Sequence, residues 1–347
     1  MTSSTAHKLL VVLTTAVVAV TGITLFDHLP DPVSATTRAT HEPSTTQYRD
    51  SGLLDEVEHR TFADDRTTIG EVLSYWTAER MAAAAPLSNM IEGTPDLGTL
   101  SLPEDEVEHH DAPHEDSEGL PWTADGEVTR TTGKVFLTMN GHDFTCSASV
   151  VDSQNRSTLV TAGHCVKDGS GQWAQNWTFV PGHTDGHSPY GRYTARDMIV
   201  PTQWAQEADD SHDYAAVVLN TDDGTAVQDR VGAQEIAFDT WTEERVRDGV
   251  QVYTFGYPSA APFDGRELHY CSGTTTPDTG DTTANGIPCA MTQGSSGGPW
   301  FSSFDTETGL GTISSVISFT YADDSPLQYG PRLGDQARRM FDDAELL

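Results

Sequence analysis

Gly294-Ser295-Ser296-Gly297-Gly298-Pro299-Trp300 is the most informative segment of this 347-residue chain. Two serines lie among three glycines, and a proline and an apolar side chain follow. Glycines let a backbone approach a substrate closely and adopt dihedral angles that other residues avoid. They also leave the N–H groups of Gly294 and Ser296 free to converge on one point. Two such donors could stabilise the oxyanion that forms when a serine attacks a carbonyl.

The segment alone fits two kinds of active site, and the order of the other residues separates them. It fits the Gly-x-Ser-x-Gly nucleophile elbow of α/β-hydrolases and the Gly-x-Ser-Gly-Gly-Pro loop of chymotrypsin-like proteases. The α/β-hydrolases place their histidine after the serine, and none follows Ser296 here. The obvious histidine is His164, in Thr161-Ala162-Gly163-His164-Cys165. The obvious acid is Asp213, directly before the apolar run Tyr214–Leu219. The chain therefore carries the order histidine, aspartate, serine.

On these motifs, the sequence resembles the trypsin/chymotrypsin-like serine peptidases. Within them it is most similar to secreted bacterial members of the actinobacterial type and to the glutamyl-endopeptidase-like branch. The resemblance covers nearly all of residues 121–347. It implies two six-stranded antiparallel β-barrels, with the catalytic residues in the cleft between them.

The residues themselves also favour an all-β fold from about Pro121 onward. Short apolar runs are separated by Gly, Asn and Asp turns, and no long helical pattern lies between them. One amphipathic helix is predicted near the end, over Asp335–Leu346. The expected strands are Lys134–Met139, Ser147–Val151, Ser157–Thr161, Trp177–Val180, Tyr214–Leu219, Gln251–Phe255 and Gly311–Thr320.

Residues 1–35 are typical of a secretory signal peptide. A lysine precedes the apolar run Leu9–Val20, and Val33-Ser34-Ala35 offers small residues for cleavage. The alternative is a membrane anchor, because a looser apolar stretch continues to Phe26. Threonines and a glycine dilute that stretch, so we expect export with cleavage, a secreted extracellular enzyme and no stable membrane association after processing.

Residues 36–120 differ in composition and predict an acidic propeptide or linker. Ile69, Val72, Leu73 and Trp76 have helical spacing, and Pro86 ends the pattern. The surrounding chain is polar, acidic and rich in proline, which is typical of loops. The Tyr75–Met81 stretch resembles the pro-region of actinobacterial members and implies a zymogen. A flexible stalk without a folding role is the alternative.

Two groups of residues could bind metal ions. His109, His110 and His114 lie among acids, but nothing in their spacing sets a geometry, so a solvated charge run is the simpler interpretation. Four cysteines could hold zinc, but close Cys-x-x-Cys pairs are absent. An even number of cysteines in an exported chain favours disulfides. The family resemblance implies the pairs Cys146–Cys165 and Cys271–Cys289. We expect no metal and no organic cofactor.

The formal net charge of −33 argues against nucleic acid or anionic membranes as partners. This charge fits adaptation to salt, where screening relieves self-repulsion, and it fits ordinary solubility equally well. Protein or peptide substrates and a monomeric state remain the expectation.

Chemistry assigns a role to each catalytic candidate. A neutral histidine, here His164, can take the proton of Ser296 and return it to the leaving amine. A buried carboxylate, here Asp213 rather than Asp209 or Asp210, sets the imidazole tautomer and stabilises the imidazolium. The register of the glycines favours Ser296 over Ser295 as nucleophile. The oxyanion hole would consist of the N–H groups of Gly294 and Ser296.

Two features concern activation and specificity. Many family members carry an acid directly before the nucleophile, which pairs with the new N-terminus after processing. Here Ser295 stands at that position, and members of the glutamyl-endopeptidase-like branch also lack this acid. The position six residues before the nucleophile holds Ala290 instead of the aspartate of trypsin-like members. We therefore expect an apolar or small pocket. By family register, the pocket residues are Ala290, Met291, Thr292, Gln293, Ser318, Phe319 and Thr320.

The sequence thus predicts a secreted serine endopeptidase that acts through an acyl-enzyme. A serine esterase with the same triad is one alternative. A non-catalytic protease-like binding protein is another, although its hallmark would be a missing triad residue and none is missing.

Overall fold

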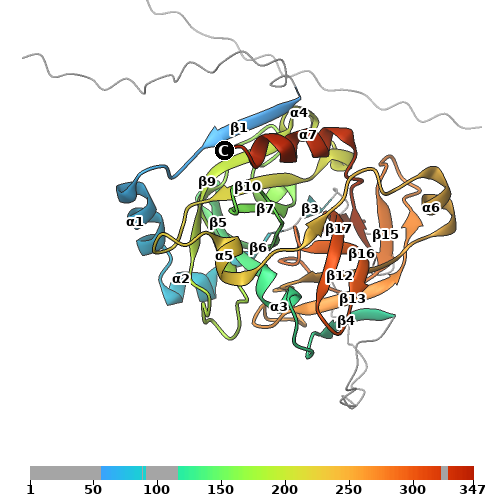
Figure 1. The fold of residues 1–347 in the computed structure, drawn as a ribbon, viewed down its shortest axis with the longest axis horizontal. Helices are drawn as coiled ribbons and strands as arrows, with labels where there is room; N and C mark the ends of the chain where they lie inside the picture. Colours follow the sequence, from blue (N-terminus) through green and yellow to red (C-terminus); the bar gives the residue numbers. More distant parts are fainter. Residues whose placement is uncertain (1–55, 88, 91–115, 322–326) are drawn as a thin grey trace, which may run out of the picture. The chain divides into compact units, whose positions relative to one another are not determined.

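The computed structural model describes residues 56–87, 89–90, 116–321 and 327–347. The expected signal peptide and the His109, His110 and His114 cluster lie outside these residues. Within the described ranges, no helix is long and apolar enough to cross a membrane. The architecture is mostly β, with few helices and a short helix at the C-terminus (Figure 1).

Six antiparallel strands close a barrel in the first half of the β-rich part (residues 121–347). They follow the order β8-β5-β6-β7-β10-β9, and β9 pairs back with β8, so the ring has no open edge. Trp177, Phe179 and Leu137 are fully buried inside it. The strands are β5 (Thr132–Met139), β6 (His142–Val150), β7 (Thr158–Thr161), β8 (Gln175–Pro181), β9 (Tyr193–Pro201) and β10 (Ala215–Leu219).

Strand β10 is buried on both faces. Ala215 and Val217 pack inside the barrel, whereas Ala216 and Val218 pack against the aromatic core of the second half. Successive side chains of a strand point to opposite faces, so a continuous apolar run is typical of a strand buried on both sides. This double burial holds Asp213, two residues before the strand begins, in the interior.

The second half of the β-rich part is built from two sheets, to which the preceding segment adds strands β3 and β4. The resemblance implied a second six-stranded barrel; here one sheet has the order β11-β17-β16-β12-β13-β4 and the other β14-β15-β19-β18-β3. The predicted strand Gly311–Thr320 is divided, because β17 ends at Val316 and β18 begins at Phe319. The strands are β3 (Asn89–Met90), β4 (Ser117–Pro121), β11 (Glu235–Ile236), β12 (Gln251–Gly256), β13 (His269–Thr274), β14 (Thr276–Pro277), β15 (Asn285–Pro288), β16 (Pro299–Asp305), β17 (Leu310–Val316), β18 (Phe319–Thr320) and β19 (Leu327–Gly330).

The helices are short and lie mostly in the connections. The predicted C-terminal helix is present as α7, which lies beside β10 (Figure 1). Its apolar side packs into the core of the second half. The helices of the β-rich part are α3 (Val128–Thr131), α4 (Thr202–Glu207), α5 (Val227–Val231), α6 (Glu243–Asp248), α7 (Asp335–Ala344) and the 3₁₀ turns η1 (Gly163–Cys165) and η2 (Asp210–His212).

The described part of the N-terminal segment has more regular structure than its composition predicted. Two helices, α1 (Arg66–Tyr75) and α2 (Ala78–Ala83), replace the single expected helix. The surrounding chain, expected to be loop, adds strands to the first barrel. Strand β1 (Val57–Thr61) pairs antiparallel with β9, and β2 (Ala85–Pro86) pairs parallel with β6.

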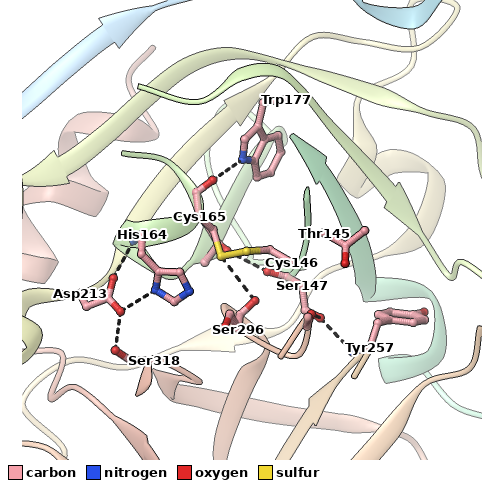
Figure 2. The surroundings of a disulfide bond; sticks show 12 residues. Thr145, Cys146, Ser147, His164, Cys165, Trp177, Asp213, Tyr257, Ser296 and Ser318 are labelled. Carbon is pink, nitrogen blue, oxygen red and sulfur yellow. Dashed lines mark hydrogen bonds and ion pairs between the residues drawn. A yellow bond between two sulfur atoms is a disulfide. The ribbon is translucent and has the colours of Figure 1, made fainter. Parts of the chain in front are cut away.

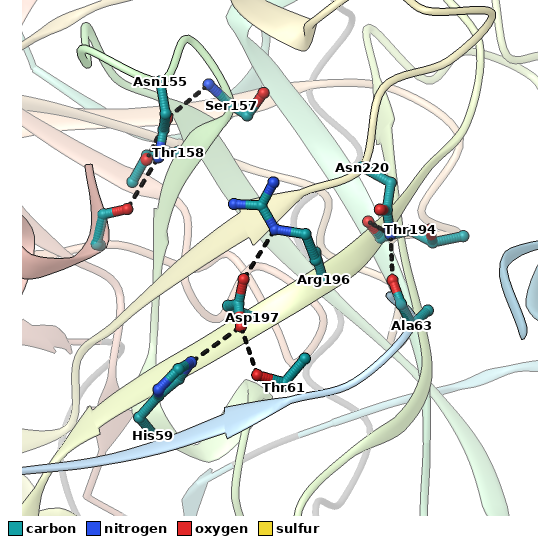
Figure 3. Close-up of polar contacts among 11 residues, drawn as sticks. His59, Thr61, Ala63, Asn155, Ser157, Thr158, Thr194, Arg196, Asp197 and Asn220 are labelled. Atoms are coloured by element: carbon teal, nitrogen blue, oxygen red, sulfur yellow. Dashed lines mark hydrogen bonds and ion pairs between the residues drawn. The ribbon is translucent and has the colours of Figure 1, made fainter. Parts of the chain in front are cut away.

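The polar residues of β1 have hydrogen-bond partners on the barrel. This explains why the polar composition of the segment predicted a loop instead of a strand. Asp197 of β9 is 5% exposed and accepts hydrogen bonds from His59 at 2.9 Å, from Thr61 at 2.8 Å and from Arg196 at 2.8 Å (Figure 3). Burial alone would raise the pKa of the Asp197 carboxyl, but these hydrogen bonds outweigh it and lower the pKa. Asn220 also donates to the carbonyl of Ala63 at 2.7 Å.

Candidate active site

His164 and Asp213 form a buried pair between the first barrel and the second half. The Asp213 carboxylate accepts from His164 Nδ1 at 2.8 Å and from the His164 backbone N–H at 2.7 Å, and Ser318 Oγ donates to it as well (Figure 2). Asp213 is fully buried and His164 is 6% exposed. Burial would raise the pKa of Asp213, but the neighbouring imidazole and these hydrogen bonds together lower it. The pair therefore holds an ionised carboxylate against the Nδ1 edge of the imidazole.

Local packing sets the position of the imidazole. Turn η1 carries His164 directly after β7, and Gly163 allows the turn to lie close to its neighbours. A Cβ on Gly163 would come within 2.8 Å of the Trp204 ring and 3.0 Å of Asp213 Oδ1. The His164 ring lies edge-on to Trp204, with 6.4 Å between ring centroids. His164 Nε2 has no hydrogen-bond partner among the described residues, so it is available to accept a proton.

Ser296 lies on the glycine-rich loop before β16, near the His164 ring (Figure 2). Gly294 has φ +98°, and a Cβ there would come within 2.9 Å of the Tyr257 carbonyl oxygen, so this position requires glycine. Ser295 is 1% exposed and its hydroxyl donates to the carbonyl of Thr292 at 2.8 Å. The Ser295 hydroxyl thus closes the loop, which leaves Ser296 as the serine that faces the histidine.

Ser147 braces this loop from the first barrel, a role that the sequence did not reveal. Its N–H donates to the carbonyl of Ser296 at 2.7 Å, and its hydroxyl donates to the carbonyl of Gly294 at 2.9 Å. The same hydroxyl accepts from the N–H of Tyr257 at 2.9 Å (Figure 2). A serine next to a disulfide cysteine on a strand carries no signal of such contacts.

Both disulfides have the pairing that the resemblance implied. Cys146 is joined to Cys165, which ties β6 to the histidine turn, and Cys271 is joined to Cys289, which ties β13 to the chain after β15. Trp177 Nε1 donates to the Cys165 carbonyl at 2.9 Å and supports the same turn. In the part of the chain that the structure describes, one cluster has metal-ligand types, namely Cys146, His164 and Cys165. Its two sulfurs are in a disulfide, so they supply no thiolate ligand.

The expected pocket residues lie on two segments, 290–293 and 318–320, and strand β19 forms hydrogen bonds with both. Gln328 of β19 donates to the carbonyl of Met291, and the Ser318 N–H donates to the carbonyl of Tyr329 at 2.9 Å. The aromatic rings of Phe319 and Tyr329 stack, with 5.1 Å between centroids. Gln328 was not predicted, because a single glutamine in a strand carries no functional signal.

The hydroxyls of the expected pocket residues already have acceptors within the protein. Thr292 Oγ1 donates to the carbonyl of Ala260 at 2.8 Å, and Thr320 Oγ1 donates to the carbonyl of Leu327 at 2.7 Å. Ser318 Oγ donates to the Asp213 carboxylate. These three hydroxyl hydrogens are therefore not available to a substrate carboxylate.

A second buried group of titratable residues lies behind the loop. The side chain of Lys134 is 6% exposed, its Nζ donates to the Gly265 carbonyl at 2.8 Å, and burial lowers its pKa to about 8. His183 packs between Phe136 and Tyr257, and burial together with the charge of Lys134 lowers its pKa to about 4. His183 is therefore neutral near pH 7. It contacts Tyr257, whose backbone binds Ser147, so it belongs to the support of the loop.

Comparison with known proteins agrees with this geometry. Residues 146–307 match the model of the trypsin-like peptidase domain. The crystal structure of a thermostable serine protease, AL20, from an extremophilic microorganism is 42% identical; the match covers 63% of this chain and 99% of that one, with a TM-score of 0.59. The chain belongs to the trypsin-like serine peptidases. It is a serine endopeptidase by family.

One further solved structure supports this assignment to the trypsin-like serine peptidases, and another shares the fold. Protease Anisep from Arthrobacter nicotinovorans is 38% identical, over 65% of this chain and 99% of that one, with a TM-score of 0.59. A Glu endopeptidase solved in complex with MPD shares the fold at 19% identity and a TM-score of 0.52, over 67% of this chain and 98% of that one. Each of these three structures matches a fraction of the chain that is close to the fraction made up by residues 121–347.

One curated protein matches over a shorter stretch. An extracellular metalloprotease of Bacillus subtilis (strain 168) is 37% identical over 73 residues, which are 21% of this chain. The chain thus spans about a quarter of that relative's length, since the match covers 23% of it.

Proposed function

We propose that His164, Asp213 and Ser296 are the catalytic triad of this serine endopeptidase. The observation that carries the proposal is the His164 Nδ1–Asp213 contact of 2.8 Å, which leaves the opposite nitrogen, Nε2, facing the serine loop. A carboxylate on Nδ1 keeps a hydrogen on that nitrogen and leaves Nε2 as the base. We propose a serine mechanism without metal.

The reaction proceeds in two halves. His164 Nε2 takes the proton of the Ser296 hydroxyl as the oxygen attacks the scissile carbonyl carbon. The resulting oxyanion is held by the N–H groups of Gly294 and Ser296, and His164 then gives its proton to the leaving amine. Water, activated by the same imidazole, attacks the acyl-enzyme ester. This second half releases the acid product and returns the proton to Ser296.

We further propose that the enzyme is secreted as a precursor and acts as a monomer, without stable membrane association. The disulfides support export, because such bonds persist in oxidising compartments. The relative named extracellular agrees with it. We expect the secreted form to begin between about residues 100 and 130, where the acidic composition ends. N-terminal sequencing of protein from the culture medium measures this directly, and a start near Thr36 would show that the acidic segment is retained.

The pocket favours an uncharged residue before the scissile bond. A buried charge without a partner costs several kcal/mol, and Ala290 supplies no carboxylate for Arg or Lys. Glutamate would need donors, but the hydroxyls of Thr292, Ser318 and Thr320 already have acceptors. We therefore expect poor cleavage after Arg, Lys and Glu and better cleavage after uncharged side chains.

Initial rates on matched peptides that differ only at this residue provide the test. A clear preference for Arg would overturn the assignment of Ala290 to the pocket base. A preference for Glu would show that the pocket hydroxyls exchange their acceptors when substrate binds. Parallel assays on an ester of the best peptide distinguish a peptidase from an esterase, because an esterase would leave the amide intact.

A further inference from the structure

Part of the N-terminal segment pairs with strands on both sides of the proposed catalytic site. Strand β2 (Ala85–Pro86) pairs parallel with Phe144 and Thr145 of β6, directly before the disulfide that holds the histidine turn. Strand β3 (Asn89–Met90) pairs parallel with β18, directly after Ser318. The blocking segment, defined here as Ala85–Leu87 and Asn89–Met90, therefore runs from the first barrel to the pocket wall.

Leu87 lies between these two pairings and contacts the oxyanion hole. Its N–H donates to the carbonyl of Thr145 at 3.0 Å, and its carbonyl oxygen accepts from the N–H of Gly294 at 3.3 Å. The Gly294 N–H is one of the two donors assigned above to the oxyanion. While Leu87 holds it, this donor is not available to a substrate carbonyl.

We propose that the blocking segment is an autoinhibitory strand, which keeps the unprocessed chain inactive by occupying sheet edges beside Ser296 and one oxyanion donor. An extended peptide gains affinity by adding to an exposed sheet edge, and a substrate needs the same edges. This inference rests on the proposed function, because it takes the Gly294 N–H as part of the catalytic machinery. It also explains how activation can proceed with Ser295 where other members have an acid.

The contacts of Leu87 differ from those of a bound substrate. A reacting carbonyl needs both donors at about 2.7–3.1 Å from its oxygen. The Leu87 oxygen lies 3.3 Å from Gly294 N, and within the described ranges it accepts no hydrogen bond from the Ser296 N–H. His164 Nε2 also finds no partner there. Leu87 thus occupies the Gly294 donor without the geometry for attack.

Residues upstream anchor the blocking segment to the first barrel. Trp76 is 2% exposed, and its ring packs on Phe136, with 5.5 Å between ring centroids. Its indole N–H donates to the Asn176 carbonyl, and its own carbonyl accepts from Arg192 at 2.9 Å. Strand β1 adds the Asp197 contacts shown in Figure 3. An anchored segment binds its site intramolecularly, so a weak strand suffices to compete with free substrate.

The test compares intact full-length chains labelled by a fluorophosphonate probe, whose phosphoryl oxygen needs the same oxyanion donors. Leu87→Pro removes the N–H that donates to Thr145, whereas Leu87→Ile keeps both backbone groups and serves as the matched control. We expect intact Leu87→Pro to label roughly tenfold faster than the intact natural chain, which is the effect of one buried hydrogen bond. Leu87→Ile should label within about twofold of the natural chain. Mass spectrometry after labelling confirms that the chains are uncut.

Processed enzyme from each variant provides the second arm, because removal of the segment leaves all of them with one sequence. We expect the processed enzyme to label at least about tenfold faster than the intact natural chain. Equal rates for the intact and processed natural chains would overturn the inference. So would an intact Leu87→Pro chain that labels as slowly as Leu87→Ile while its processed form labels normally. If neither form labels or cleaves peptides, the proposed triad is wrong instead.

Discussion

Ser296→Ala is expected to abolish peptide hydrolysis and fluorophosphonate labelling by the processed enzyme. Without the hydroxyl no acyl-enzyme forms, and the remaining site can only bind substrate and polarise its carbonyl. Because triad residues act as a unit, kcat should fall by about 10⁵–10⁶-fold. KM should change little, since the hydroxyl contributes mainly to the transition state. Steady-state kinetics on the best peptide, with titration of active sites, measures both parameters.

The neighbouring serine provides the matched control. Ser295 donates to the Thr292 carbonyl and is buried, so Ser295→Ala removes a structural hydrogen bond of the same loop. We expect this variant to keep labelling and most of its activity. Labelling that survives Ser296→Ala but disappears in Ser295→Ala would move the nucleophile by one residue.

Asp213→Asn should lower kcat by about 10³–10⁴-fold, the effect expected when the imidazole loses its orienting carboxylate. The amide can donate to His164 Nδ1, which would leave the hydrogen on Nε2 and remove the base. It also leaves the Ser318 hydroxyl facing an amide in place of a carboxylate. Stopped-time assays with high enzyme concentration resolve the residual rate, and circular dichroism checks that the buried site has folded.

Asp209→Asn is the control for this substitution, since Asp209 was one of the two competing acids in the sequence. Its carboxylate caps η2 through the Ser211 N–H at 2.9 Å and contacts His212, away from His164. We expect this variant to retain nearly the natural kcat. A loss as large as that of Asp213→Asn would contradict the assignment of the orienting acid.

The sequence predicted the elements whose burial is periodic or continuous. The run after Asp213 and the amphipathic pattern of α7 are such cases, and both elements lie within one or two residues of their expected bounds. Strand β9 was missed because Arg196 and Asp197 interrupt its apolar pattern. The Asp197 carboxylate accepts hydrogen bonds from Arg196 and from His59 and Thr61 of β1, more than a hundred residues earlier in the chain. A pairing between such distant segments leaves no local signal.

The candidate site likewise contains residues that the sequence indicated and residues that it could not indicate. The sequence order and the glycine register pointed to His164 and Ser296, because the chemistry restricts which residue types can stand there. The contacts of Ser147 and Gln328 could not be predicted, since they depend on which backbone carbonyls the fold brings near. The same holds for Leu87, whose neighbours are set by strand pairing and not by its own side chain.

Burial of the lysines has a practical consequence for labelling and immobilisation. Residues 121–347 contain two lysines, Lys134 and Lys167, and they are 6% and 5% exposed. The Lys167 ammonium donates to backbone carbonyls, including that of Ala205 at 2.9 Å, as Lys134 does to Gly265. We expect the processed enzyme to keep both ammonium groups buried, because these carbonyl partners all belong to residues 121–347. Amine-reactive dyes and supports would then meet one accessible amine, the new N-terminus. Coupling at neutral pH would attach each molecule at a single defined point, and acylation would leave both internal ammonium groups unmodified.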